Sequence, residues 1–180
     1  METINRIVHG SSIPWTGPLL TSYEMATKSQ DPSTQNGAVL LSAANLSVIG
    51  VGYNHFPLGV DSSHWHGDKE GKYARVVHAE TATLFDAAKQ GLSTLNSTLV
   101  CAWAACSNCA KHIVAAGVSR LVRHTFSNSG TDTGSHWYAD CLVGDEIMLN
   151  AGVQIIEVDP VESDVVLRRN GQPWSSKVSV

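Results

Sequence analysis

The strongest constraint in this sequence is one histidine and two cysteines in the arrangement of metal ligands. His78-Ala79-Glu80 precedes Cys106-Ser107-Asn108-Cys109 along the chain. One imidazole and two thiolates are three ligands of the kind that catalytic zinc uses, and they leave the fourth coordination position open for water. Glu80 cannot easily share the metal with His78, but it can carry protons beside the bound water. The spacing therefore predicts a catalytic zinc site.

The length and charge of the chain restrict what it can fold into and bind. Its 180 residues suffice for one ordinary domain, so we expect a single domain over 1–180 with a core over about 19–158. Hydrophobic residues make up 43% and charged residues 16%, as in globular proteins. The net charge is -4 and no long run of Lys or Arg occurs. This argues against a nucleic acid polymer as partner but permits a small anionic substrate.

The cysteines and the first residues together indicate a reducing compartment. The chain has four cysteines, and its start lacks an apolar signal core. No run approaches the roughly 18 apolar residues that a membrane helix needs, so we expect no membrane partner. We therefore expect a cytoplasmic protein, in which a C-x-x-C pair binds a metal or is redox-active more often than it forms a structural bridge.

Periodicity and turn residues predict alternating helices and strands after an irregular arm that ends near Pro18. We expect helices over 19–27, 77–90, 106–116 and 137–150, and strands over 37–41, 48–53, 98–103, 119–123 and 153–158. Residues 54–73 have the pattern of a long loop, and the tail is weakly patterned. This order predicts one mixed five-stranded sheet with helices on both faces. His78 and Cys106 then begin two helices, where the partial positive charge favours thiolates.

Other roles for these residues stay open at this point. A structural zinc site would need a fourth protein ligand, which Cys101 or Cys141 can supply, although both fit better as small core residues. Solvation in loops is a simpler interpretation than a second metal site for His64, His66 and His136.

Further short motifs surround the predicted zinc ligands. They are Asp31-Pro32-Ser33-Thr34, Gly37-Ala38-Val39, Gly52-Tyr53-Asn54, Phe56-Pro57-Leu58-Gly59, Lys72-Tyr73 and Cys109-Ala110-Lys111. H-x-E followed by C-x-x-C is the signature of zinc-dependent nucleobase deaminases. With these motifs the chain resembles the deoxycytidylate (dCMP) deaminases over about residues 29–158. Gly-Tyr-Asn, then Phe-Pro and a long insertion before His-Ala-Glu, separates that family from its nucleoside and tRNA relatives, and phage-encoded members carry similar insertions.

The resemblance implies the three-layer α/β/α cytidine deaminase-like fold. It also implies hydrolytic deamination of dCMP to dUMP and ammonia, which supplies dUMP for dTMP synthesis. His78, Cys106 and Cys109 would bind Zn2+, which lowers the pKa of its water from about 15.7 towards roughly 7. The resulting hydroxide would attack C4 of cytosine while Glu80 moves the protons.

The resemblance further implies where the substrate lies. Asn54 would hydrogen-bond the deoxyribose, and the segment from Ser33 to Asn36 would line the sugar and 5′-phosphate pocket. Ala79 belongs to the same substrate-binding set, and we expect a backbone carbonyl near Ala104 to accept the exocyclic amine. The sequence does not rank the candidates for gripping the phosphate, which are Arg75, Arg123 and Ser127.

Regulation is a further implication of the resemblance. Members of this family are commonly hexamers that dCTP activates and that dTTP inhibits together with Mg2+. The effector lies near a subunit interface against the Gly-Tyr-Asn loop. The residues expected near it here are Asn54, His55, Phe56, Gly59 and Lys72.

Three positions depart from the family pattern. Ala105 replaces the proline that precedes the first zinc cysteine, so backbone rigidity is lost there. Asn36 replaces an apolar residue, and its amide either reaches the substrate or caps a strand. His55 replaces a glycine that lets the backbone approach a phosphate closely, which puts effector binding in question.

Two other functions compete with dCMP deamination. One is deamination of another cytosine nucleotide or nucleoside, such as dCTP or deoxycytidine; adenosine in tRNA is disfavoured because the chain has no basic patch. The other is a non-catalytic, zinc-stabilised binding module. Glu80 argues against that module, because a structural zinc site has no use for this residue.

Overall fold

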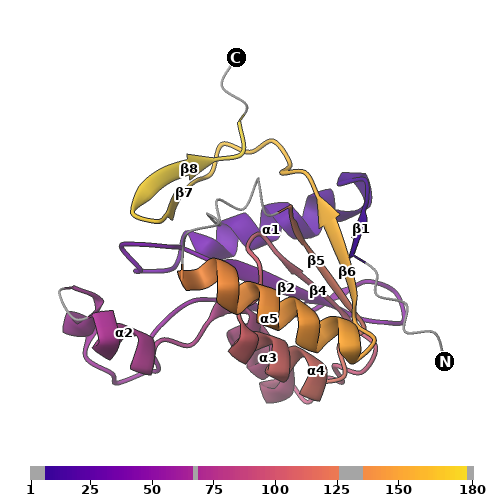
Figure 1. Cartoon of the computed structure of the whole chain (residues 1–180), viewed down its shortest axis with the longest axis horizontal. Helices are drawn as coiled ribbons and strands as arrows, with labels where there is room; N and C mark the ends of the chain where they lie inside the picture. Colours follow the sequence, from indigo (N-terminus) through magenta and orange to yellow (C-terminus); the bar gives the residue numbers. More distant parts are fainter. Residues whose placement is uncertain (1–6, 67–68, 126–135, 178–180) are drawn as a thin grey trace.

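A mixed β-sheet forms the centre of the molecule (Figure 1). The computed structural model describes residues 7–66, 69–125 and 136–177. The strands of the sheet are β1 (Ile7–His9), β2 (Gly37–Leu41), β3 (Val48–Tyr53), β4 (Thr98–Cys101), β5 (Arg120–His124) and β6 (Gln154–Val158). Within the described ranges these six pair in the order β1-β6-β5-β4-β2-β3. The first four in this order are parallel, whereas β2 runs antiparallel to both β4 and β3.

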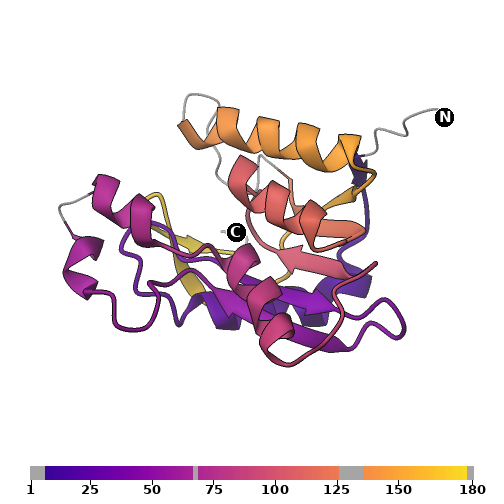
Figure 2. The same cartoon turned by 90° about the horizontal axis from the view of Figure 1, so that it is seen from below.

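Helices cover both faces of this sheet (Figures 1 and 2). The helices are α1 (Thr16–Ala26), α2 (Lys69–Arg75), α3 (Ala79–Lys89), α4 (Ser107–Ala115) and α5 (His136–Asn150). Along β2, Ala38 and Leu40 belong to the core that α3, α4 and α5 cover, whereas Val39 and Leu41 belong to the core beneath α1. Successive side chains of a strand point to opposite faces, so α1 and the other three helices lie on opposite sides. The expected three-layer α/β/α arrangement is confirmed.

Within the described residues, the main sheet has one strand more than the five that the sequence predicts. Strand β1 pairs with β6 over three residues at the sheet edge, and so short a segment carries no readable periodicity. Helix α1 begins at Thr16 rather than at the predicted Leu19. Pro18 does not prevent this start, because it lies in the first turn, where the backbone N–H that proline lacks would have no partner within the helix. Helix α2 occupies part of the segment expected as a loop. No helix in the described ranges is long and apolar enough to span a membrane.

The tail forms a β-hairpin, which the sequence analysis misses. Strands β7 (Val166–Arg169) and β8 (Gln172–Ser175) pair in antiparallel fashion. Asn170 and Gly171 join them with φ values of 52° and 78°. A two-residue turn with positive φ at both positions favours Asn-Gly, so a local signal for this hairpin is present in the sequence.

Aromatic contacts hold this hairpin against the α1 face of the sheet. The ring of Trp174 lies 4.8 Å from the Trp103 ring and 5.7 Å from the Tyr23 ring, centroid to centroid. The Tyr23 hydroxyl is hydrogen-bonded to Nε2 of His124 at 2.8 Å. Burial lowers the pKa of His124 to about 4, so this imidazole is neutral at neutral pH. Leu167 is only 1% exposed. The hairpin is therefore part of the packed structure.

The close approach of α3 to β3 depends on Gly52. A methyl group at this position would lie 2.5 Å from the backbone nitrogen of Thr83 and 2.8 Å from the carbonyl oxygen of Ala79. Both atoms belong to the backbone of α3, which cannot move aside as a side chain can. Thr83 Oγ1 also donates hydrogen bonds to the carbonyl oxygens of Ala79 and Ala38, at 2.8 and 3.2 Å. Glycine at position 52 thus allows α3, the helix that follows His78, to pack closely against β3.

We expect Gly52→Ala to lower the free energy of unfolding by about 2 kcal/mol or more, because the added methyl overlaps the α3 backbone. Urea unfolding followed by circular dichroism measures this change. Gly17→Ala is the control, since nothing lies within 4 Å of a methyl group there. Its position in the first turn of α1 predicts equal or slightly higher stability. Equal stability of the two variants would contradict this account of the β3–α3 contact.

Candidate active site

Two helix N-termini meet on one face of the sheet. His78 immediately precedes α3, and Cys106 immediately precedes α4, with Cys109 in its first turn. Both helices pack into the same buried cluster and lie on the same side of the sheet (Figure 2). The sequence prediction that His78 and Cys106 begin two helices is confirmed to within two residues.

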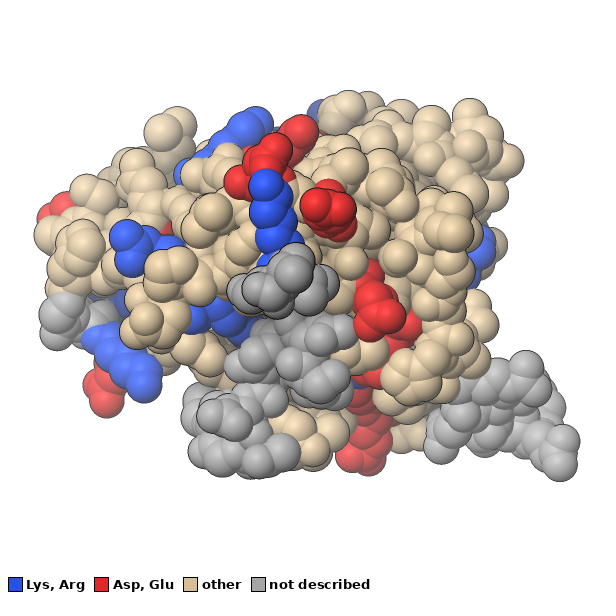
Figure 3. Space-filling model, turned by 90° about the horizontal axis from the view of Figure 1, so that it is seen from above, with Lys and Arg blue, Asp and Glu red and all other residues tan. Residues whose placement is uncertain are grey.

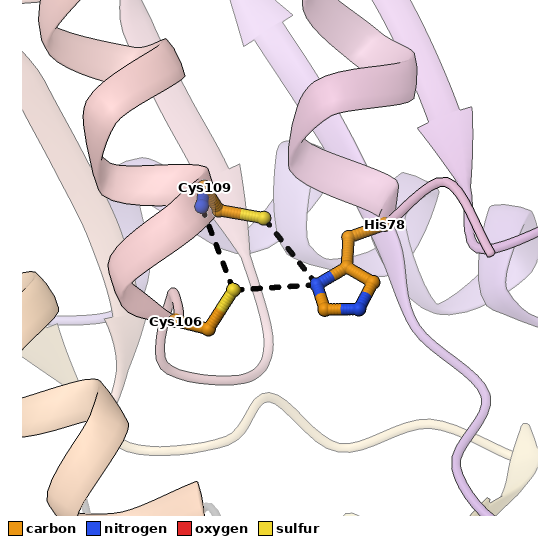
Figure 4. Close-up of side chains that lie close together, drawn as sticks. All are labelled: His78, Cys106 and Cys109. Carbon is orange, nitrogen blue, oxygen red and sulfur yellow. Dashed lines mark hydrogen bonds between the residues drawn. The ribbon is translucent and has the colours of Figure 1, made fainter. Parts of the chain in front are cut away.

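The three predicted ligands converge on one point (Figure 4). Nδ1 of His78 lies 3.4 Å from Sγ of Cys106 and 3.4 Å from Sγ of Cys109. Tetrahedral ligands at about 2.3 Å for sulfur and about 2.0 Å for nitrogen lie about 3.5 Å from each other around zinc. The donor types and their separations therefore fit a zinc ion, with Nδ1 as the histidine ligand.

Within the described residues, the cluster of possible ligands contains these three side chains, whose donor atoms lie within 4.8 Å of one another. The two cysteines considered as a fourth ligand have other contacts. Cys101 Sγ donates to Oδ1 of Asn36 at 3.4 Å, and Cys141 Sγ donates to the carbonyl oxygen of Ala104 at 3.7 Å. Burial raises the pKa of Cys141 to about 12, which keeps it a neutral thiol. A site with three protein ligands and an open position is typical of catalytic zinc.

The local electrostatics prepare Cys106 to bind a cation. The Cys106 sulfur accepts hydrogen bonds from the Cys109 thiol, from His78 and from the Cys109 backbone N–H, which lies 3.5 Å away. These hydrogen bonds lower the pKa of Cys106 to about 4 despite its burial. The pKa of Cys109 moves well above its ordinary value, because its thiol donates to Cys106 and is itself buried. One thiolate is thus already favoured before any metal binds.

Glu80 lies in the first turn of α3 and is only 2% exposed. Burial raises its pKa to about 7, against the opposing effect of nearby His78. Nδ2 of Asn36 donates to Oε2 of Glu80 at 3.5 Å, while Oδ1 of Asn36 accepts from Cys101. The structure shows the Asn36 amide pointing towards the Glu80 carboxylate in the cavity.

A cavity opens beside the three ligands. It is lined by His78, Glu80 and Cys106, and by the five predicted substrate residues Ser33, Asn36, Asn54, Ala79 and Ala104. Sequence reasoning misses two tryptophans and two hairpin residues that also line it: Trp103, Trp137, Arg169 and Asn170. Trp103 follows β4 and directly precedes Ala104. Trp137 on α5 and the two residues of the tail are brought to the site only by the packing of distant segments.

A polar network forms one wall of this cavity. Both amide hydrogens of Asn54 are used within the chain: Nδ2 donates to Asp31 at 3.1 Å and to the carbonyl oxygen of Thr34 at 2.8 Å. Its Oδ1 accepts the Asn36 N–H at 2.8 Å. Asp31 also pairs with Nζ of Lys72 at 2.8 Å. Asn54 thus holds the cavity wall in shape and keeps one acceptor lone pair for a ligand.

Helix α5 supports the segment where Ala105 replaces proline. Ala105 is fully buried. Two atoms of the neighbouring Ser107, its backbone nitrogen and its hydroxyl, donate to the Asp140 carboxylate in α5 at 3.2 and 2.6 Å. These contacts fix the start of α4 from outside. The backbone rigidity that proline would give is supplied here by tertiary contacts.

Of the five residues expected near an effector, Asn54 and Lys72 line the cavity, and His55, Phe56 and Gly59 do not. His55 pairs with Val77 in a single antiparallel bridge. Phe56 stacks on Trp65 with ring centroids 3.9 Å apart, and Gly59 is exposed.

Two of the three residues considered as phosphate ligands, Arg123 and Arg75, differ in burial and position in the structure. Arg123 is fully buried in β5, where its guanidinium pairs with Asp145 at 2.6 and 2.7 Å and with Glu157 at 2.9 Å. Arg75 is exposed on α2 and does not itself line the cavity, although its neighbour Val76 does. Ser127 and the side chain of His136 lie outside the described residues.

We expect Cys106→Ala to lose most of its zinc during dialysis against a mild chelator that leaves the wild-type protein loaded, because a ligand is removed. Elemental analysis by mass spectrometry gives the zinc content per chain. Cys141→Ala is the matched control, since it removes a buried thiol outside the ligand set and should keep its zinc. Loss of zinc from Cys141→Ala would make that residue a fourth ligand and the site structural.

Comparisons with known proteins agree with this geometry. Against an uncharacterized deaminase encoded in the luxG 3′ region of Aliivibrio fischeri, the chain is 33% identical over 131 residues, which are 71% of this chain and 81% of that one. Against the deoxycytidylate deaminase of Mus musculus it is 30% identical over 110 residues, 58% of this chain and 60% of the mouse protein. The chain thus spans under two thirds of the mouse enzyme's length.

A solved structure shares the fold. The dCMP deaminase from the cyanophage S-TIM5, in complex with dCMP and dUMP, matches with a TM-score of 0.63 and 21% identity over 83% of this chain and 99% of that one. The model of the family described as "Cytidine and deoxycytidylate deaminase zinc-binding region" matches residues 19–125, which include all three ligands and Glu80. The chain therefore belongs to the cytidine and deoxycytidylate deaminase zinc-binding family.

Proposed function

We propose that this protein hydrolyses dCMP to dUMP and ammonia, with Glu80 as the proton carrier. The observation that carries the proposal is a buried carboxylate with a raised pKa beside a three-ligand zinc site in an open cavity. Support for dCMP comes from the resemblance of the motifs around the site and from relatives named deoxycytidylate deaminase. The single-domain organisation over 1–180 is part of the same proposal.

The residues of the site divide the work of the reaction. Zinc held by His78, Cys106 and Cys109 would supply a Lewis acid that makes a water molecule nucleophilic at neutral pH. Glu80 accepts the proton of that water, passes it to the ring nitrogen of cytosine and later protonates the departing ammonia. Asn36, 3.5 Å from Glu80, holds the carboxylate in place during these transfers.

The cavity walls orient the base and the sugar. The carbonyl oxygen of Ala104 accepts the exocyclic amine, and Ala79 lies against the ring. Trp137 contacts His78 edge to face with 5.8 Å between ring centroids, which shields the reacting face from water. The remaining acceptor position of Asn54 receives the 3′-hydroxyl of the deoxyribose.

We further propose that dCTP activates and dTTP with Mg2+ inhibits a hexamer of this chain. This proposal rests on the resemblance of the segment from Gly52 to Gly59. That segment begins next to the cavity. His55 directly follows Asn54, which lines the cavity, and it pairs with Val77, which directly precedes His78. A ligand there would contact Phe56 and Gly59 directly and reach the cavity through Asn54 and the Asp31–Lys72 pair.

Replacing Glu80 with glutamine removes the proton carrier but keeps the shape of the side chain. We expect Glu80→Gln to lower kcat for dCMP by about 100-fold or more, with zinc content unchanged. Ammonia release gives the rate, and elemental analysis gives the zinc. Glu24→Gln, an exposed change on α1, is the control and should leave kcat unchanged. Near-wild-type turnover by Glu80→Gln would refute the mechanism.

Substrate preference separates the proposal from its alternatives. We expect the zinc-loaded protein to release ammonia from dCMP faster than from CMP, deoxycytidine or dCTP. Turnover of dCMP should rise with dCTP and fall with dTTP plus Mg2+. A preference for deoxycytidine or dCTP would assign the other deaminase activity. No turnover of any cytosine compound by folded, zinc-loaded protein would support the non-catalytic binding module.

A further inference from the structure

The C-terminal hairpin β7–β8 forms a wall of the cavity. Its turn is bound to the segment that carries the predicted substrate residues: the N–H of Gly171 donates to the Ser33 carbonyl at 2.8 Å, and the N–H of Asn170 donates to Oγ1 of Thr34 at 3.2 Å. The N–H of Gln35 donates to the Arg168 carbonyl at 3.0 Å. These bonds place the hairpin turn at a fixed position beside the cavity.

Arg169, the last residue of β7, lines the cavity from this wall. Its guanidinium lies over the ring of Trp103, with 4.7 Å between its central carbon and the ring centroid. Trp103 is itself fixed, because Nε1 donates to the carbonyl oxygen of Gln35 at 2.9 Å. A guanidinium stacked on an aromatic ring has a defined plane, and its N–H groups match the oxygens of a phosphate in that plane.

Within the described residues, Lys72 and Arg169 are the lysine and arginine side chains that line the cavity. Arg169 is half-buried, and a partly desolvated guanidinium interacts strongly with an anion. Among the arginines in the described ranges, Arg169 is the one that lines the cavity. On the face shown in Figure 3, most Lys and Arg atoms gather on the left, the side of α2 and the hairpin in Figure 1.

The segment from Ser33 to Asn36 connects this cation with the catalytic end of the cavity. Asn36 contacts Glu80, whereas Ser33 and Thr34 contact the hairpin turn. Three residues of extended chain span up to roughly 10 Å. A nucleotide whose base lies at Glu80 therefore extends its sugar along this segment towards Arg169.

We propose that Arg169 binds the 5′-phosphate of the substrate and thereby selects nucleotides over nucleosides. The proposal rests on the proposed deamination of a cytosine nucleotide. A charge-assisted, bidentate contact between a guanidinium and a phosphate is among the stronger hydrogen-bonded interactions in proteins. A nucleoside loses this contact entirely.

The test compares ligands that differ only in the phosphate. Isothermal titration calorimetry measures the binding of dUMP and of deoxyuridine to zinc-loaded protein, and ammonia release gives kcat and KM for dCMP and deoxycytidine. We expect Arg169→Gln to weaken dUMP binding and to raise the KM of dCMP by about 10- to 100-fold. Binding of deoxyuridine and kcat for both substrates should change by less than about 2-fold. Arg169→Lys keeps the positive charge but lacks the planar guanidinium that forms two parallel hydrogen bonds. Its dUMP affinity and its KM for dCMP should therefore lie between those of the wild type and of Arg169→Gln.

Arg168→Gln is the matched control, because Arg168 is exposed on the same strand and should leave every one of these values unchanged. Zinc content and thermal unfolding confirm that each variant is folded. Equal weakening of dUMP and deoxyuridine by Arg169→Gln, or wild-type protein that binds both equally, would overturn the phosphate site. If the protein does not turn over dCMP but still binds dUMP more tightly than deoxyuridine, and this preference depends on Arg169, the deaminase function is refuted and the phosphate site is retained.

Discussion

The convergence of one imidazole and two thiols at the ends of two helices is the interaction on which the rest of the site depends. Polar side chains this deep in a protein need compensation. The N-termini of α3 and α4 provide part of it, and a cation held by the three ligands would provide the rest. The separations of 3.4 Å between Nδ1 and each sulfur require both helices to sit at fixed positions on the sheet. Gly52 beneath α3, and Asp140 against the start of α4, set those positions.

Around this centre, Asp31, Asn36 and Asn54 shape the cavity through hydrogen bonds with named partners. Asp31 accepts from the backbone of Ser33 and Thr34, from Asn54 and from Lys72. A buried carboxylate with so many donors is held rigidly, and its loss would leave several groups unpaired. Asn36 extends the same network to Glu80. The network thus links the cavity wall formed by Asp31 and Asn54 to the Glu80 carboxylate.

The part of the chain that matches the family model ends before the elements that complete the cavity. That match covers residues 19–125, whereas Trp137 lies on α5 and Arg169 on the C-terminal hairpin. The zinc chemistry therefore belongs to the family region. The proposed contacts with the rest of the substrate come in part from elements beyond that region.

The sequence by itself determined the chemistry of the site. His78, Glu80, Cys106 and Cys109 are readable because zinc accepts few ligand types and because helix starts follow local signals. The alternation of helices and strands, and with it the layered fold, is likewise local. Strand β1, the hairpin's place against Trp103, and the cavity lining by Trp137 and Arg169 were decided only by the tertiary structure. These features join segments far apart in the chain, and no periodicity or spacing encodes a contact that exists only once the core between them has packed.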